Sequence, residues 1–214
     1  MDNSLTRVRV FLETGKPPEI PNVRDGLEKE TMSVMNIHNS PDLLLASFIS
    51  EKRQKSLVLI TGPSGSGKTA CCTELVSQAR EQGFSVGGIL CPAVFERGKK
   101  VGIDQLDIST RERRRLGIRS NSTGNGMVGR WQMDESVIAW GNQIIAGLES
   151  EDVIIIDELG PLELEEGYGY QEALRLLDEG CYRTAFIVVR PALLPLAQLR
   201  WPKSHVFELE SEAA

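Results

Sequence analysis

The sequence predicts an α/β fold in which a mainly parallel β-sheet is covered by helices on both faces. Strand-like and helix-like segments alternate from residue 56 onward. Three strand-like segments are almost entirely apolar: 56–61 (SLVLIT), 152–157 (DVIIID) and 184–190 (TAFIVVR). Strands of this kind are buried on both faces, which is typical of a parallel sheet between two helical layers.

Helices and a hairpin complete this pattern. Helices are expected over residues 68–83, 135–148, 169–180 and 191–200, and a last strand over 205–210. Residues 84–95 and 101–108 resemble two strands on either side of the segment ERGKK. We therefore expect a β-hairpin with Gly98 at its turn.

The first part of the chain follows a different pattern. Residues 6–13 (TRVRVFLE) allow one short strand, and Ser40 can cap a helix that begins at Pro41. The apolar face of that helix would carry Leu44, Leu45, Phe48 and Ile49. We expect an N-terminal extension over 1–55, made of a loop and a docking helix, followed by a main domain over 56–210.

The composition is that of an ordinary globular protein, with 41% hydrophobic and 25% charged residues among 214. The net charge of −6 argues against nucleic acid as a partner. No apolar run reaches the ~18 residues of a membrane span. The polar start MDNSLTRVRV is not a signal peptide. We therefore expect a cytoplasmic protein with no membrane partner.

One stretch is basic although the whole chain is acidic. Residues 94–120 contain eight Lys and Arg against four Asp and Glu, a net charge of +4. The basic residues are Arg97, Lys99, Lys100, Arg111, Arg113, Arg114, Arg115 and Arg119. This stretch is either a solvated surface loop or a loop that faces phosphate groups, and nucleic-acid binding is a third alternative.

The cysteines and histidines do not suggest a metal site. The chain has two histidines and four cysteines, and no cysteine pair has C-x-x-C spacing, so zinc is not expected. Cys71 and Cys72 are adjacent within a predicted helix and are expected to pack as small apolar residues. We expect the thiols to be reduced, as in the cytoplasm.

A glycine-rich motif follows the first apolar strand directly. GPSGSGKT matches G-x-x-x-x-G-K-[ST] and stands between a strand and a helix, as a phosphate-binding loop requires. The backbone N–H groups of such a loop and the positive end of the helix attract phosphate. Lys68 can reach the β- and γ-phosphates, and the Thr69 hydroxyl can bind Mg²⁺. The predicted nucleotide-binding residues are Gly62, Pro63, Ser64, Gly65, Ser66, Gly67, Lys68 and Thr69.

Two carboxylates end the second apolar strand, at the same predicted edge of the sheet. Asp157 fits the aspartate that holds Mg²⁺ in P-loop proteins, with a helix cap as the alternative. Glu158 fits a general base for the attacking water, with a solvated or structural carboxylate as the alternative. The two motifs predict a P-loop NTPase domain over 56–210 that binds a nucleoside triphosphate with Mg²⁺ as cofactor.

With both motifs in place, the chain resembles the THEP-type, or cancer-related, nucleoside-triphosphatase family. The matching segments are LITGPSGSGKT, GFSVGGIL, GKKVGIDQLDI, VGRWQMDE and VIIIDELGPLEL, which together span about residues 56–210. The resemblance implies a single-domain P-loop fold with RecA-like affinities and slow, Mg²⁺-dependent hydrolysis of several nucleoside triphosphates. It also implies that Gly62–Thr69 bind phosphate, that Asp157 serves Mg²⁺ and that Glu158 is the base.

The chain departs from the family at three places. Pro161 stands where some relatives have a lysine, so any contribution of that lysine is absent here. The basic segment STRERRRLGIRS differs from the family's more usual sequence, and the first 55 residues have no recognised counterpart.

Further side chains are candidates for the site. Arg190 ends the strand at 184–190 on the ligand side of the sheet, where it is either a catalytic residue near the γ-phosphate or a surface residue in a salt bridge. The same question applies to Arg113, Arg114 and Arg115. Trp131 either stacks on a nucleobase or packs half-buried.

Three classes of function are compatible with these motifs. The first is hydrolysis of nucleoside triphosphates to diphosphate and phosphate. The second is a kinase acting on a nucleotide or small metabolite, with RERRR as a lid over the phosphates. The third is a nucleotide-dependent regulatory module with a protein partner. The Asp-Glu pair favours the hydrolase, because kinases of this type often lack it, while the preferred base and the oligomeric state stay open.

Overall fold

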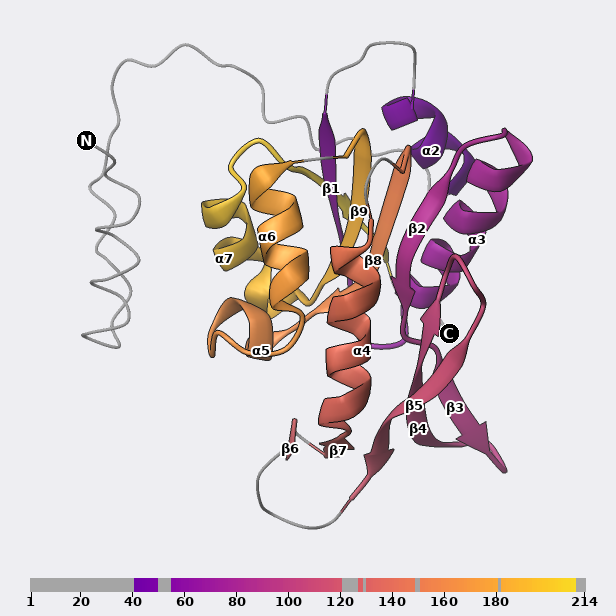
Figure 1. Ribbon diagram of the computed structural model, residues 1–214, viewed down its shortest axis with the longest axis vertical. Helices are drawn as coiled ribbons and strands as arrows, with labels where there is room; N and C mark the ends of the chain where they lie inside the picture. Colours follow the sequence, from indigo (N-terminus) through magenta and orange to yellow (C-terminus); the bar gives the residue numbers. More distant parts are fainter. Residues whose placement is uncertain are drawn as a thin grey trace, which may run out of the picture. The chain divides into compact units, whose positions relative to one another are not determined.

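The computed structural model describes residues 41–49, 55–120, 127–128, 130–148, 151–180 and 182–210, all within one compact unit, Ser33–Ala214. Within these residues, ten strands form one mixed sheet. Its order is β10-β1-β9-β8-β2-β4-β5-β7-β6, and β3 pairs with β4 (Figure 1).

The parallel half of the sheet agrees with the prediction. Its strands are β1 (Ser56–Thr61), β2 (Val86–Leu90), β8 (Val153–Leu159), β9 (Thr184–Val189) and β10 (His205–Glu208). All pairings within the series β10-β1-β9-β8-β2 are parallel. The phosphate-binding motif after β1 and the carboxylates at the end of β8 therefore lie at the same edge of the sheet.

The other half of the sheet is antiparallel. It consists of β3 (Ala93–Glu96), β4 (Lys99–Asp107), β5 (Arg113–Arg119), β6 (Met127–Val128) and β7 (Trp131–Met133). The predicted hairpin around Gly98 is present as β3 and β4. The expected basic loop is wrong for the segment Arg113–Arg119, which forms β5 and pairs with β4. Arg113, Arg114 and Arg115 are all exposed on this strand, whereas the next residue, Leu116, is 3% exposed and joins the apolar core.

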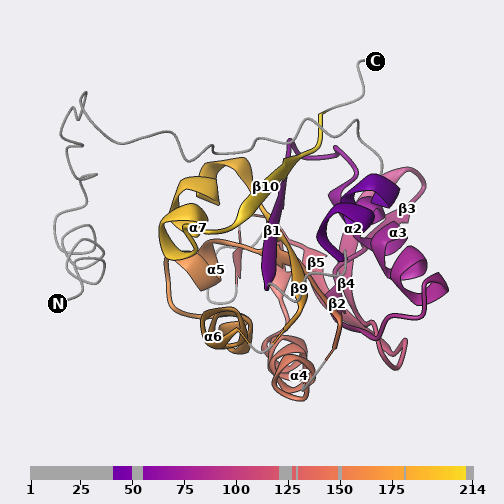
Figure 2. The same cartoon turned by 90° about the horizontal axis from the view of Figure 1, so that it is seen from above.

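Helices cover both faces of the parallel half (Figure 2). On one face lie α2 (Pro41–Ile49) and α3 (Lys68–Glu81); on the other lie α4 (Glu135–Ala146), α5 (Pro161–Leu164), α6 (Gln171–Glu179), the 3₁₀ turn η1 (Pro191–Leu193) and α7 (Leu194–Arg200). The side chains of β1 alternate between the two faces of the sheet, so this strand contributes to the apolar core on each face. Val58 and Ile60 join the apolar core with α2 and α3, whereas Leu57 and Leu59 join the core with α4, α6 and α7.

The helix predicted after Pro41 docks on the main sheet. Leu44 and Leu45 are fully buried in the core under α3. Phe48 contacts Phe186 edge to face with ring centroids 6.5 Å apart, and its carbonyl accepts a hydrogen bond from Thr184. The predicted strand at 6–13 and the cap Ser40 lie outside the described residues, and the division near residue 55 stays a prediction.

Cys71 and Cys72 are buried on α3, as predicted. Burial raises the pKa of the Cys71 thiol to about 11, so this thiol is protonated and unreactive near neutral pH. Cys181 lies outside the part of the chain that the structure describes. No helix in the described part is both long and apolar enough to cross a lipid bilayer.

Candidate functional site

The glycine-rich loop between β1 and α3 has the backbone of a phosphate-binding loop. Gly62, Gly65 and Gly67 have φ values of 143°, 87° and 84°, which residues with a Cβ rarely adopt. A Cβ on Gly62 would collide with the Leu209 carbonyl. A Cβ on Gly65 or Gly67 would meet no atom within 4 Å. The first glycine is thus needed for packing, and the other two border open space at the start of α3. Pro63 and Ser64, the remaining predicted loop residues, are exposed on its rim.

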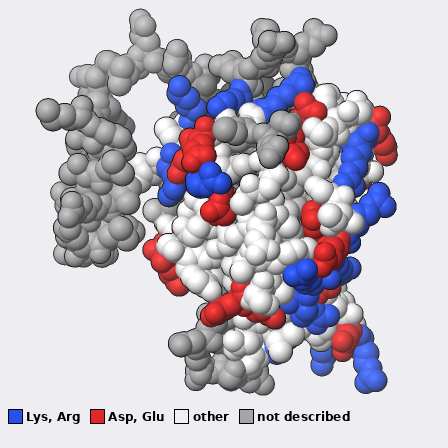
Figure 3. Space-filling model, in the orientation of Figure 1, with Lys and Arg blue, Asp and Glu red and all other residues white. Residues whose placement is uncertain are grey.

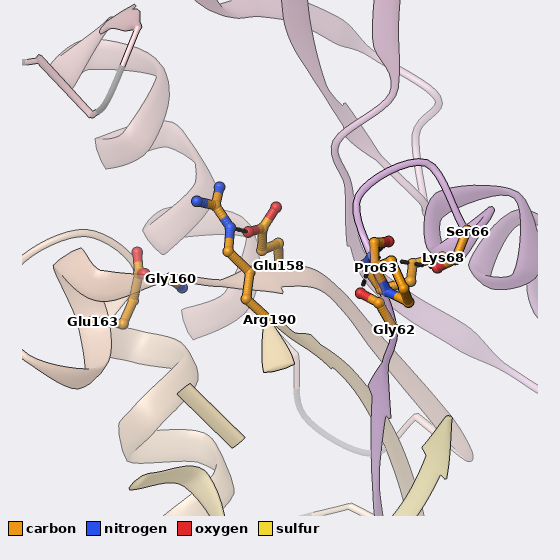
Figure 4. Close-up of polar contacts among 8 residues, drawn as sticks. All are labelled: Gly62, Pro63, Ser66, Lys68, Glu158, Gly160, Glu163 and Arg190. Atoms are coloured by element: carbon orange, nitrogen blue, oxygen red, sulfur yellow. Dashed lines mark hydrogen bonds and ion pairs between the residues drawn. The ribbon is translucent and has the colours of Figure 1, made fainter. Parts of the chain in front are cut away.

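Lys68 folds back onto this loop (Figure 4). Its Nζ donates hydrogen bonds to the carbonyls of Gly62 at 2.7 Å and Pro63 at 2.6 Å, and lies 3.5 Å from Oγ of Ser66. Partial burial lowers the pKa of Lys68, while the negative charges of Glu158 and Asp157 act in the opposite direction. The lysine is therefore close enough to both carboxylates to sense their charges.

Asp157 is the buried carboxylate of the site, with 2% of its surface exposed. Its Oδ2 accepts a hydrogen bond from the backbone N–H of Cys91 at 3.0 Å, and the Thr69 hydroxyl lies near enough to lower the pKa of this carboxylate. Burial raises the pKa of Asp157, while the hydrogen bonds from Cys91 and Thr69 oppose that rise. The structure thus brings the end of the phosphate-binding motif into contact with the end of β8.

Glu158 is the next residue of β8 and is paired with Arg190, which directly follows β9 (Figure 4). Nε of Arg190 donates to Oε1 of Glu158. The side chains are 33% and 53% exposed, so this ion pair lies at the surface edge of the site. Because neighbouring strand residues point to opposite faces, Asp157 is buried while Glu158 is accessible.

The side chains of Arg113, Arg114 and Arg115 form their ion pairs on the antiparallel half of the sheet. Figure 3 shows basic side chains, with acidic ones among them, gathered over β3, β4 and β5 at the lower right. Arg113 and Arg115 both pair with Asp104, at 2.6 and 2.5 Å. Arg114 pairs with Glu112 at 2.7 Å and its guanidinium lies 4.1 Å from the ring centre of Trp140. The loop interpretation is therefore wrong for these three arginines, which lie on β5 with acidic partners on or beside that strand. A contact of any of them with phosphate stays a prediction.

Trp131 lies on β7, half-buried, with Nζ of Lys100 5.0 Å from the centre of its ring. This contact agrees with the packing alternative. The stacking alternative stays a prediction, since it concerns a bound nucleobase.

Two buried polar residues, Glu163 and Gln105, were not singled out from the sequence. Glu163 is 6% exposed and accepts hydrogen bonds from the backbone N–H groups of Gly160 at 2.7 Å and Tyr170 at 2.9 Å. Oη of Tyr170 lies 2.6 Å from the side-chain amide of Gln105. The spacing of Gly160, Pro161 and Glu163 is that of a helix start with an acidic residue at its third position, which was the available signal for Glu163. No comparable local signal links Gln105 to a residue 65 positions away.

The residues present fit a magnesium ion. Within the described part of the chain, no group of three or more His, Cys, Asp or Glu side chains could hold a metal by itself. Thr69 and Asp157 instead offer two oxygen ligands, near enough to each other that the Thr69 hydroxyl lowers the pKa of Asp157. Mg²⁺ typically binds through one or two protein oxygens and takes its other ligands from water and substrate phosphates.

Comparisons with known proteins agree with this geometry. A family model described as NTPase matches residues 57–206. The nucleoside-triphosphatase THEP1 of Methanopyrus kandleri is 31% identical over 132 residues, which cover 61% of this chain and 72% of that protein. The nucleoside-triphosphatase THEP1 of Methanothermobacter thermautotrophicus is 36% identical over 127 residues, which cover 57% of this chain and 68% of that protein.

A solved structure supports the fold. The solution structure of a human cancer-related nucleoside triphosphatase superimposes with a TM-score of 0.58 at 22% identity, covering 73% of this chain and 90% of that one. The resemblance seen in the sequence is thereby confirmed. The chain belongs to the NTPase family, together with the THEP1 nucleoside-triphosphatases.

Proposed function

We propose that this protein hydrolyses nucleoside 5′-triphosphates to the diphosphate and inorganic phosphate, with Mg²⁺ as cofactor. One observation carries the proposal: the buried carboxylate of Asp157, at the end of β8, lies beside Thr69 of the phosphate-binding loop, whose hydroxyl lowers its pKa. Lys68, beside Thr69, senses the charges of both Asp157 and Glu158. A cation, a hydroxyl and two carboxylates thus converge where a triphosphate would lie against the loop.

The loop would hold the β- and γ-phosphates. The backbone N–H groups around Gly65 and Gly67 border open space, and α3 directs its positive end toward the same place. Lys68 would exchange the carbonyls of Gly62 and Pro63 for phosphate oxygens, which are stronger acceptors for an ammonium group.

Thr69 and Asp157 would hold the metal through their oxygens. When bound, Mg²⁺ neutralises charge on the β- and γ-phosphate oxygens. The Cys91 N–H donates to Oδ2 of Asp157, which helps to fix the orientation of the carboxylate.

Glu158 would serve as the base. The water oxygen forms a bond to the γ-phosphorus while the bond to the β–γ bridging oxygen breaks, and the diphosphate leaves with that electron pair. The water proton passes to the Glu158 carboxylate and from there to solvent. Arg190, which contacts Glu158, would place its guanidinium against the γ-phosphate and stabilise the charge of the transition state.

We infer that the protein acts in the cytoplasm and that nucleic acid is not its partner. The cysteines Cys71, Cys72 and Cys91 are free thiols, which agrees with a reducing compartment. The arginines Arg113 and Arg115 share one acidic partner, which argues against a nucleic-acid surface on β5.

The test is phosphate release from ATP, GTP, CTP and UTP with Mg²⁺, for the wild type and for Lys68→Ala and Glu158→Gln. The wild type is expected to turn over. Lys68→Ala is expected to lose nucleotide affinity, whereas Glu158→Gln is expected to bind ATP with a kcat lower by roughly 10²–10⁴-fold. A wild-type protein that releases no phosphate from any of the four nucleotides would overturn the proposal.

Matched controls separate these effects from general damage. Lys203→Ala and Glu166→Gln change the same residue types at exposed positions outside the site. Both controls are expected to behave as the wild type. A Glu158→Gln protein with the wild-type rate would remove Glu158 from the mechanism. The phosphate-binding role of Lys68 would then still be tested by Lys68→Ala.

A further inference from the structure

A cavity of about 80 Å³ adjoins the carboxylates at the end of β8. It is separate from the residues of the phosphate-binding loop, none of which lines it. Its apolar wall comes mainly from the antiparallel strands and α4, through Ile103, Leu116, Met133 and Ile138. Glu158 and Arg190 line the same cavity, so it shares the predicted base and arginine with the site described above.

Most polar groups in the wall of the cavity already have partners inside the protein. Both carboxylate oxygens of Glu163 accept backbone hydrogen bonds, from Gly160 and Tyr170. The Tyr170 hydroxyl is paired with Gln105, and Asp157 is held by Cys91 and Thr69. The Glu158–Arg190 pair is different because both side chains are partly exposed and the carboxylate has a second oxygen besides the one that Arg190 contacts.

The size of the cavity does not match a single hydrolytic water. One water needs about 10–15 Å³ of such space and two to four polar partners. A space of about 80 Å³ is roughly five to eight times larger than that requirement. Several waters would occupy it against apolar walls, where they find few hydrogen bonds. An organic group with an apolar body and one polar end fits these walls better than water does.

We propose that this cavity is an acceptor subsite for a small apolar alcohol, whose hydroxyl faces Glu158 and takes the γ-phosphoryl group in place of water. The inference rests on the proposed function, because it uses the same bound triphosphate and the same base. Ring or branched aliphatic bodies would contact Leu116 and Met133, while Glu158 accepts the hydroxyl proton and Arg190 stays beside the phosphoryl group.

The reaction balances without a further reagent. The alcohol oxygen forms a bond to the γ-phosphorus, and the bond to the β–γ bridging oxygen breaks. The nucleoside diphosphate leaves with that electron pair, and the hydroxyl proton passes to Glu158 and then to solvent. The products are a phosphate monoester and the diphosphate, in contrast to inorganic phosphate and diphosphate from hydrolysis.

The test uses benzyl alcohol as the probe, with the full chain, ATP and Mg²⁺. Phosphorus NMR of the products separates benzyl phosphate from inorganic phosphate. The expected result is benzyl phosphate whose yield saturates with the alcohol concentration, as binding to a defined subsite requires. Methanol, which lacks the apolar body, is expected to give at least roughly tenfold less ester at equal concentration, in line with the burial of one apolar ring.

Variants that fill the cavity locate the subsite. Leu116→Phe and Met133→Phe both add volume to its wall and are expected to lower the yield of benzyl phosphate by at least roughly tenfold. Thermal unfolding and ATP binding verify that each variant is folded. Met133 is half-buried, so its replacement is expected to disturb the fold less than that of the buried Leu116. Leu199→Phe, at a 52% exposed position on α7, is the matched control and is expected to give the wild-type yield.

The outcomes distinguish the two proposals. Inorganic phosphate without benzyl phosphate, from a protein that hydrolyses ATP, overturns the acceptor subsite and leaves the hydrolase standing. Benzyl phosphate formed equally well by the folded filled variants also overturns the subsite. A third outcome is that benzyl phosphate forms and depends on the cavity, while the protein releases no inorganic phosphate from ATP when the alcohol is left out. This outcome supports the subsite and overturns the hydrolase. No phosphate transfer to either acceptor overturns both.

Discussion

Arg190 donates a hydrogen bond from Nε to Oε1 of Glu158, which joins the ends of β9 and β8 by an ion pair. While this ion pair holds, one oxygen of the Glu158 carboxylate is occupied by Arg190. In the proposed reaction the arriving γ-phosphate competes for Arg190, because phosphate offers more negative charge and more acceptor oxygens. Nucleotide binding would thereby release Glu158 for the proton transfer.

Removing this arginine is expected to impair turnover much more than nucleotide binding. Arg190→Ala takes away the cation nearest to the predicted base, so kcat should fall by on the order of 10³-fold, as for arginines that act on the γ-phosphate. The KM for ATP should change less, since Lys68 and the loop remain. Steady-state phosphate release measures both quantities.

The control for this variant is Arg200→Ala. Arg200 is also an exposed arginine in a salt bridge, with Asp178 at 2.5 Å, but it lies on α7 away from the carboxylates. It should keep the wild-type kcat. An Arg190→Ala protein with unchanged kcat would assign Arg190 to the surface salt-bridge alternative.

Asp157→Asn is expected to inactivate the protein and to stabilise its fold near neutral pH. Burial raises the pKa of Asp157 above the ordinary aspartate value of 3.8, which we take for the unfolded chain. Between the pKa of the unfolded chain and the higher pKa of the folded state, the folded state binds more protons than the unfolded state. The free energy of unfolding therefore falls as the pH rises through this window. Asparagine carries no charge and avoids that loss. We expect the Tm at about pH 7 to rise by roughly 2–4 °C, the change that ~1 kcal/mol produces in a domain of this size.

The pH dependence is the control for this explanation. The difference in Tm between Asp157→Asn and the wild type should shrink as the pH is lowered toward about 4, where the unfolded carboxyl also takes up its proton. Thermal unfolding followed by circular dichroism at both pH values measures it. A stabilisation of equal size at the two pH values would contradict the burial of charge as its cause.

Glu163→Ala is expected to destabilise the turn that follows β8. The variant leaves the backbone N–H groups of Gly160 and Tyr170 without their acceptor, in a position that is 6% exposed. A buried donor without a partner costs about 1–3 kcal/mol, so the loss of the acceptor for two donors should lower the free energy of unfolding by roughly 2–6 kcal/mol. Urea unfolding measures the loss. The exposed Glu166→Ala is the control and should change stability by less than about 0.5 kcal/mol.

The sequence was most informative where one local pattern carries the whole signal. The loop motif after β1 needs only its own glycines, Lys68 and Thr69, and the strand β8 is recognisable from four consecutive β-branched residues. The order of these motifs along the chain also placed both at one edge of a parallel sheet. Such features depend on neighbours in the sequence, which is why they could be predicted.

The interactions that were missed join distant segments. Arg113 and Arg115 looked like part of a charged loop because their shared partner, Asp104, is visible only in the register of β4 against β5, which contains a bulge. The partner of Arg190 lies 32 residues earlier, at Glu158. Hydrophobic periodicity says nothing about which surface charges meet, so these pairs required the folded structure.

The two kinds of glycine in the loop lead to two more predictions. Gly62→Ala should act on stability, because a Cβ at this position would collide with the carbonyl of Leu209, a backbone atom held by the hydrogen bond from Leu209 N–H to the Thr61 carbonyl at 2.8 Å. Its φ of 143° adds strain. We expect a loss of about 2–4 kcal/mol in the free energy of unfolding, measured by urea unfolding without nucleotide.

Gly65→Ala should act mainly on nucleotide binding. A Cβ there meets no atom within 4 Å, so the fold pays only the strain of a φ of 87°. The methyl group would instead occupy space beside the loop N–H groups, and the loss of one hydrogen bond to a charged phosphate should raise the KM for ATP by at least roughly tenfold. Gly98→Ala is the matched control, because Gly98 has a similar φ of 75° and equal open space in the β3–β4 turn. If Gly98→Ala raised the KM as much as Gly65→Ala does, the effect would come from backbone strain, and the open space at Gly65 would not be the place where the phosphates bind.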